Sequence, residues 1–145
     1  MGEEMSHWLD PLISKEQARR AVMFSFKEAI PGFVTVLTKA LEADAKRYLD
    51  AFSGWPDTIE ILPDATNASI VVKRTNYRGD GQAILRLVAE KQAISCEYIG
   101  LRAATWHESL EVNDLGLNCR KLAPEYCARE LSEKILKPLL FDSSS

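Results

Sequence analysis

The sequence predicts an α+β fold in a single domain, 1–145, in which an antiparallel sheet is preceded and followed by helices. Apolar residues recur at helical spacing as far as Gly54, alternate one by one from Thr58 to Val112, and return to helical spacing after Pro124. The turns between the alternating segments are short, which favours antiparallel pairing over crossover connections. We therefore expect a meander of four to five strands with the C-terminal helix packed on one sheet face.

The N-terminal helix is predicted to follow a loose lead, residues 1–13. Ser14 and Gln17 have the spacing of a capping box, in which each side chain satisfies a free backbone N–H at the start of a helix. Pro31-Gly32 should kink or split this helix, because proline removes a backbone donor. The second part then continues towards Gly54, a residue that commonly ends helices.

The alternating region divides into short strands separated by turn residues. The expected strands are 58–62, 69–75, 82–89, 93–99 and 106–112, with turns at 63–67 and 76–81 and a brief pairing at 117–120. Pro124 suits the first position of the last helix, and Pro138 limits that helix before a flexible tail, 142–145.

The composition is that of an ordinary globular domain, with 46% hydrophobic and 27% charged residues. The net charge of −3 argues against a protein that coats nucleic acid through bulk charge. Three cysteines without paired spacing indicate reduced thiols in a cytoplasmic protein. No run approaches the ~20 apolar residues of a membrane span, so we expect no membrane partner.

Catalytic chemistry has few candidates in this sequence. His107, with Glu108 or Glu111 and with Tyr98 nearby, is the acid–base set of an enzyme hypothesis. Cys119 precedes two basic residues, which favour a thiolate. No spacing of histidines and cysteines predicts a metal site, and no glycine-rich phosphate loop predicts a nucleotide, so no metal and no cofactor is expected.

The densest positive region lies in the hairpin between Lys73 and Lys91. Its basic residues are Lys73, Arg74, Arg78 and Arg86, with Tyr77 among them. Such a set can contact phosphates while the tyrosine stacks on a base, which gives a nucleic-acid hypothesis. The alternative, which we favour, is a solvated outer face whose charges prevent edge pairing of the sheet.

The hypothesis that we place first is a non-catalytic binding or interaction module. The aromatic residues of the first helix cannot all lie on one stripe, so some are expected to be exposed. A groove between helices and sheet would take a small apolar ligand or a protein partner, and a homodimer belongs to the same hypothesis. The surface expected to line the groove comprises Phe24, Phe33, Tyr98, Trp106 and His107.

Overall fold

The computed structural model describes residues 7–119 and 123–141 and confirms the α+β class. Helix α1, Leu9–Ala51, is followed by a five-stranded antiparallel sheet, a small hairpin and helix α2, Pro124–Leu140. The strands of the sheet are β1 (Thr58–Asp64), β2 (Ser69–Asn76), β3 (Gly79–Val88), β4 (Ala93–Ile99) and β5 (Trp106–Ser109), in spatial order β1-β2-β3-β4-β5. The hairpin consists of β6 (Glu111–Asn113) and β7 (Gly116–Asn118).

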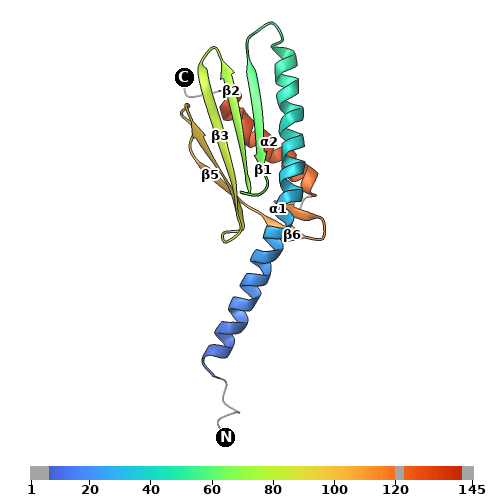
Figure 1. The fold of residues 1–145 in the computed structure, drawn as a ribbon, viewed down its shortest axis with the longest axis vertical. Coiled ribbons are helices and arrows are strands. Elements are labelled where there is room, and N and C mark those ends of the chain that lie inside the picture. Colours follow the sequence, from blue (N-terminus) through green and yellow to red (C-terminus); the bar gives the residue numbers. More distant parts are fainter. Residues whose placement is uncertain (1–6, 120–122, 142–145) are drawn as a thin grey trace.

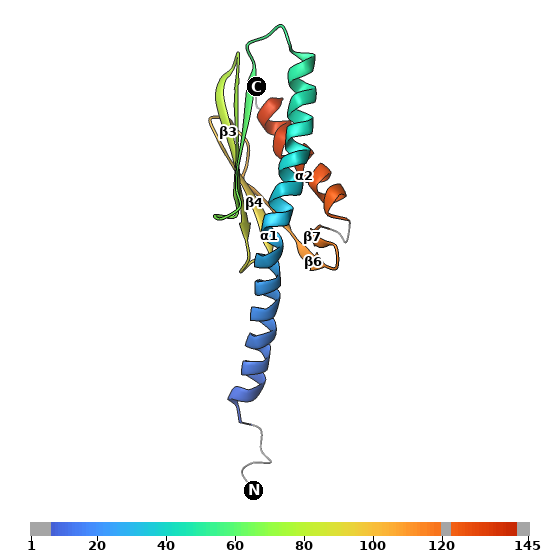
Figure 2. The same ribbon diagram turned by 45° about the vertical axis from the view of Figure 1, so that its right-hand side comes forward.

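The molecule has two layers, with α1 and α2 on one face of the sheet (Figures 1 and 2). Alternation along the strands decides which face they cover, because successive side chains point to opposite sides. In β2, Ile70 and Val72 are buried while Lys73 is exposed. The core lies between the layers, where Leu37 and Leu41 of α1 are fully buried.

Helix α1 is continuous through Pro31, so the predicted split is wrong, whereas a bend is visible where the helix reaches the sheet (Figure 1). Proline lacks the N–H for one ladder bond and bends the helix without ending it. The predicted capping box at Ser14 is also wrong. The helix begins at Leu9, and Trp8, its N-cap residue, makes no side-chain capping bond.

The N-terminal part of α1 projects alone beyond the domain (Figures 1 and 2). The first fully buried side chain along the helix is Phe26, and of residues 9–25 only Met23 packs, partly buried, against the core. Five large apolar side chains on or beside this segment are exposed: Trp8, Leu12, Ile13, Val22 and Phe24. We call residues 9–25 the projecting segment.

Three predicted details of the sheet need correction. Pro63 and Asp64 lie in β1 rather than in a turn, which an edge strand permits because its outer N–H groups need no partner. The loop expected at 76–81 is a tight turn, since Asn76 pairs with Gly79. The strand expected at 106–112 breaks at buried Leu110, after which the chain pairs with β7 instead of β4.

Candidate functional site

The principal concave site is an open groove between α1 and α2. Its volume is about 1060 Å³. The α1 wall extends from Val36 to Phe52, which corresponds to about 24 Å of helix. This length exceeds that of most small ligands. The predicted groove between helices and sheet is therefore replaced by a groove between the two helices, because core side chains fill the space under the sheet.

The floor of the groove is made of small and aliphatic side chains. Ala40 and Ala43 come from α1, and Ala128 and Leu136 come from α2. The two helices are joined across the groove by a hydrogen bond of 2.7 Å that the Ser132 hydroxyl donates to the Asp44 carboxylate. Small side chains keep the floor low, so that another helix could approach closely.

Charged residues of both signs line the rim. They are Lys39, Asp44 and Arg47 on α1, and Glu125, Arg129, Glu133 and Lys137 on α2. An apolar floor with a charged rim is the usual anatomy of a protein interface rather than of a catalytic centre.

Aromatic side chains close one end of the groove. Tyr48 lies 4.8 Å from Phe52 and 5.7 Å from Phe141 between ring centroids, and both phenylalanines are exposed. Burial raises the pKa of Tyr48, and the hydrogen bond that its hydroxyl donates to Asp57 raises the pKa further. A smaller cavity of about 250 Å³ adjoins this end and includes exposed Trp55.

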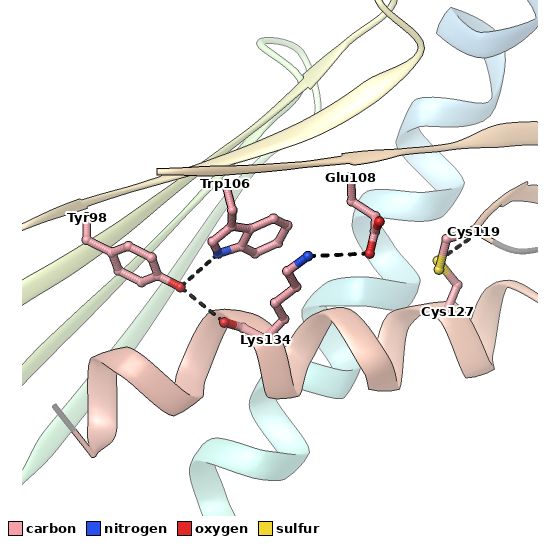
Figure 3. A network of polar contacts seen from close by, with 6 residues as sticks. All are labelled: Tyr98, Trp106, Glu108, Cys119, Cys127 and Lys134. Carbon is pink, nitrogen blue, oxygen red and sulfur yellow. Dashed lines mark hydrogen bonds and ion pairs between the residues drawn. The ribbon is translucent and has the colours of Figure 1, made fainter. Parts of the chain in front are cut away.

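Two of the predicted surface residues, Tyr98 and Trp106, do lie together, in a polar network under the sheet (Figure 3). The Tyr98 hydroxyl accepts a bond of 3.1 Å from the Trp106 indole and donates to the carbonyl oxygens of Lys134 and Ile135. The Lys134 ammonium lies 4.5 Å from the Trp106 ring centroid. Burial raises the pKa of Tyr98, which keeps its hydroxyl protonated. This network joins β4 and β5 to α2.

The acid–base set of the enzyme hypothesis is not assembled. His107 is exposed on the outer face of β5, whereas Glu108 points inward and lies 3.6 Å from the ammonium of Lys134 (Figure 3). Neighbours along a strand point to opposite faces, so the pairing of His107 with Glu108 is wrong. Glu111 is exposed on β6, outside the main sheet.

The cysteines have the character of core residues. Cys96, Cys119 and Cys127 are buried and free. Burial raises the pKa of Cys96 to about 11, and burial likewise raises the pKa of Cys127. The Cys119 amide donates to the Cys127 sulfur over 3.1 Å (Figure 3). The basic residues expected to activate Cys119, Arg120 and Lys121, lie outside the described residues.

The two phenylalanines predicted for one apolar surface are separated. Phe33 is 2% exposed and belongs to the core, whereas Phe24 is 62% exposed on the projecting segment. Helical geometry requires this difference, because nine residues correspond to two and a half turns and place the two side chains on opposite sides.

The predicted basic patch is divided between two faces. Lys73 and Arg86 lie on the outer face, where Arg86 is 3.7 Å from Glu97. Arg74 is 3% exposed on the inner face and donates to the carbonyl of Leu139 at the end of α2. Arg78 occupies the β2–β3 turn and donates to the Tyr77 hydroxyl. Of the four residues of the predicted patch, Lys73, Arg78 and Arg86 remain as surface cations.

The expectation that no run approaches a membrane span needs correction, because helix α1 is long and apolar enough by composition to cross a membrane; it is the one such helix among the described residues. A third of its most apolar stretch is buried within the domain, and core helices of globular proteins have the same composition. Composition alone therefore does not distinguish a span from a helix that is covered by protein.

Comparison of the chain with protein-family models, with curated proteins and with solved structures found no match. The inter-helix groove was missed at the sequence level. Its only sequence signal was the row of alanines, Ala40, Ala43 and Ala51, on the side of the helix away from the predicted core stripe.

Proposed function

We propose that this chain is a non-catalytic interaction module that binds an apolar helix in the groove between α1 and α2. The observation that carries the proposal is the shape and lining of the groove, which combines a low apolar floor, an aromatic end and a rim of mixed charge. Helix-in-groove recognition uses such a surface, with apolar side chains of the bound helix as anchors.

A polypeptide suits the groove better than a small molecule does. The groove follows α1 over about four and a half turns and is open along its length, whereas small-ligand sites enclose most of the ligand. The polar residues of the enzyme hypothesis are separated: Tyr98 and Glu108 lie under the sheet, His107 points to its other face, and Glu111 lies on β6. Within the described ranges, no group of three histidine, cysteine or acidic residues could hold a metal ion.

Protection of an engineered thiol tests the proposal. The native cysteines are buried, so a maleimide should react first with an introduced surface cysteine. Ala43→Cys places a thiol in the groove, and Glu42→Cys places one on an exposed side of the same turn as the matched control. Labelling is measured in source-cell extract and in purified protein at several concentrations.

We expect Ala43→Cys to label at least about tenfold more slowly than Glu42→Cys wherever the groove is occupied, because a bound helix excludes the reagent. If the slow labelling of Ala43→Cys disappears in urea, the protection depends on folded protein. Equal rates for the two variants in extract and at every protein concentration would mean that nothing occupies the groove, and the proposal would then be wrong.

A further inference from the structure

One line of small residues runs along α1 from the projecting segment into the groove. At 100° per residue these side chains share one side of the helix, and their spacing of three or four residues is that of a coiled-coil seam. The seam comprises Ala18, Val22, Ser25, Ala29, Gly32, Val36, Ala40 and Ala43. None of these residues is fully buried, and an added Cβ at Gly32 would meet no atom within 4 Å.

Most of the seam is symmetric about its centre. When two copies of α1 are aligned antiparallel, with their midpoints between Ile30 and Pro31, six of the eight seam residues face each other in pairs, while Val22 comes level with Lys39 and Ala40 comes level with Ala21. Ala18 faces Ala43, Ser25 faces Val36, and Ala29 faces Gly32. A two-fold interface requires such self-complementarity, since each patch must meet a copy of itself. A heterologous partner imposes no such requirement.

We infer that the occupant of the groove is the projecting segment of a second copy, so that the chain forms an antiparallel, two-fold symmetric dimer about the centre of α1. This inference rests on the proposed function and names its partner. In this arrangement each projecting segment lies along the α1/α2 groove of the other copy, and the seam of each copy is covered by the seam of the other.

The contact area is sufficient for a stable dimer. Residues 9–25 form about 25 Å of helix, and burying half of a helix of about 10 Å diameter removes roughly 400 Å² from water. Two helices and two grooves therefore bury roughly 1,600 Å² in total, which is the standard size of a specific protein interface.

Charges and aromatic rings match at the same alignment. On the wheel of α1, Lys15 and Arg19 lie on the flank that also carries Asp44, the flank facing α2. In the dimer these cations come level with residues 46 and 42 of the other copy, on either side of the level of Asp44. Opposite charges at matching levels fix the register of antiparallel helices.

The end of the projecting segment matches the aromatic end of the groove. Trp8 is 69% exposed and lies on the same α2-facing flank of the helix. The antiparallel alignment brings it level with Ser53, one residue beyond Phe52, at the end of the groove that also carries Phe141. A large exposed indole that reaches an open aromatic pocket is the kind of anchor that dominates interface energies. Phe24 and Ile13 lie on the other side of α1, outside this contact.

The experiment uses the purified full chain. Size-exclusion chromatography with light scattering should give twice the chain mass of 16.3 kDa. The double variant Ser25→Cys/Val36→Cys should oxidise to a covalent dimer, because the two positions are about 16 Å apart within one helix and adjacent only between copies. Phe24→Cys/Thr35→Cys is the matched control at the same level on the other side of α1, and it should not cross-link.

The variant Gly32→Gln distinguishes loss of the dimer interface from misfolding of the chain. A glutamine at the centre should weaken dimerisation by at least about tenfold while leaving the helical circular dichroism unchanged. The unfolding free energy of the monomer, measured at concentrations too low for association, should be unchanged or higher, since helices favour glutamine over glycine. Phe24→Ser should leave the mass unchanged. A monomer at all concentrations, or cross-linking through the control pair, would overturn the inference.

Two further outcomes distinguish the inference from the proposed function. If Ala43→Cys is protected in source-cell extract while the purified chain stays monomeric, the groove binds another polypeptide, and only the second copy is excluded. Co-sedimentation of the chain with phosphatidylcholine–phosphatidylglycerol vesicles, with loss of the light-scattering dimer, would instead assign the exposed side of α1 to a membrane and overturn the dimer.

Discussion

Arg74→Met should destabilise the domain strongly, although Arg74 is one of two adjacent basic residues in a hairpin. Its guanidinium is buried, and its Nε donates to the Leu139 carbonyl over 2.8 Å. Its Nη1 donates to the carbonyl of Gly79 over 2.8 Å and to the side chain of Asn76 over 3.3 Å. Arg74 thus joins the β2–β3 turn to the last turn of α2, where a cation also complements the helix dipole.

Methionine keeps most of the side-chain volume but leaves these acceptors unpaired. Each hydrogen bond to a charged donor contributes roughly 1.5–3 kcal/mol, and a buried orphan carbonyl costs the desolvation of that group. Methionine also removes the free-energy cost of burying a charged guanidinium, and this gain offsets part of the lost hydrogen-bond energy. We expect a net destabilisation of about 3 kcal/mol, which for a chain of 145 residues lowers the Tm by about 10 °C.

Urea unfolding followed by circular dichroism measures this difference, and Lys73→Met is the matched control. Lys73 is the preceding residue on the same strand but is exposed on the outer face, so its loss should change the free energy of unfolding by less than about 0.5 kcal/mol. Equal effects of the two substitutions would refute the argument that Arg74 is a structural residue. Arg74 would then have to be counted with Lys73, Arg78 and Arg86 as a surface cation available to the nucleic-acid hypothesis.

Four further predictions concern single residues. Gly100→Ala should lower the Tm, because φ at this position is +83° and the added Cβ would lie 2.6 Å from the Asp80 carbonyl oxygen. Gly32→Ala should raise the unfolding free energy of the monomer by up to about 1 kcal/mol, because alanine favours the helix and its Cβ would meet no atom within 4 Å. Burial raises the pKa of Cys96 in the folded state to about 11, from 9.0. The contribution of this thiol to the free energy of unfolding is therefore complete below pH 9 and is lost as the pH rises to 11, because the unfolded state loses the proton first. Cys96→Ala should reduce the fall of the unfolding free energy over this pH range, measured by urea titration. Tyr98→Phe should cost about 1–2 kcal/mol by calorimetry, since the indole that donates to Tyr98 loses its acceptor.

Side-chain periodicity predicted the sheet well because burial on one face imposes alternation directly. The segment 93–99 is a strand with the expected bounds, and its inward residues Ile94, Cys96 and Tyr98 are the buried ones. The errors arose where a local signal competes with context. A capping box at Ser14 shows where a helix can begin, but serine inside a helix costs only tenths of a kcal/mol, so the helix continues back to Leu9.

The candidate site was less predictable because it depends on how elements pack. That Lys73 and Arg74 point to opposite faces follows from strand geometry and could have been deduced from the sequence. The groove could not, because it requires the position of α2 beside α1, which no pattern within either helix specifies. The same holds for the Tyr98 network, whose acceptors are backbone carbonyls of α2.

The composition of α1 is itself an argument for a second covered side. Its core stripe, which includes Phe26 and Leu41, is buried against the domain, so transfer of the helix into a bilayer would require the domain core to open. The seam residues, among them Val22 and Ala43, lie on another side of the helix and face solvent or the groove. A helix that is apolar beyond one stripe is normally covered by more than one neighbour. The antiparallel partner supplies that neighbour over the whole length of the seam and leaves the core intact.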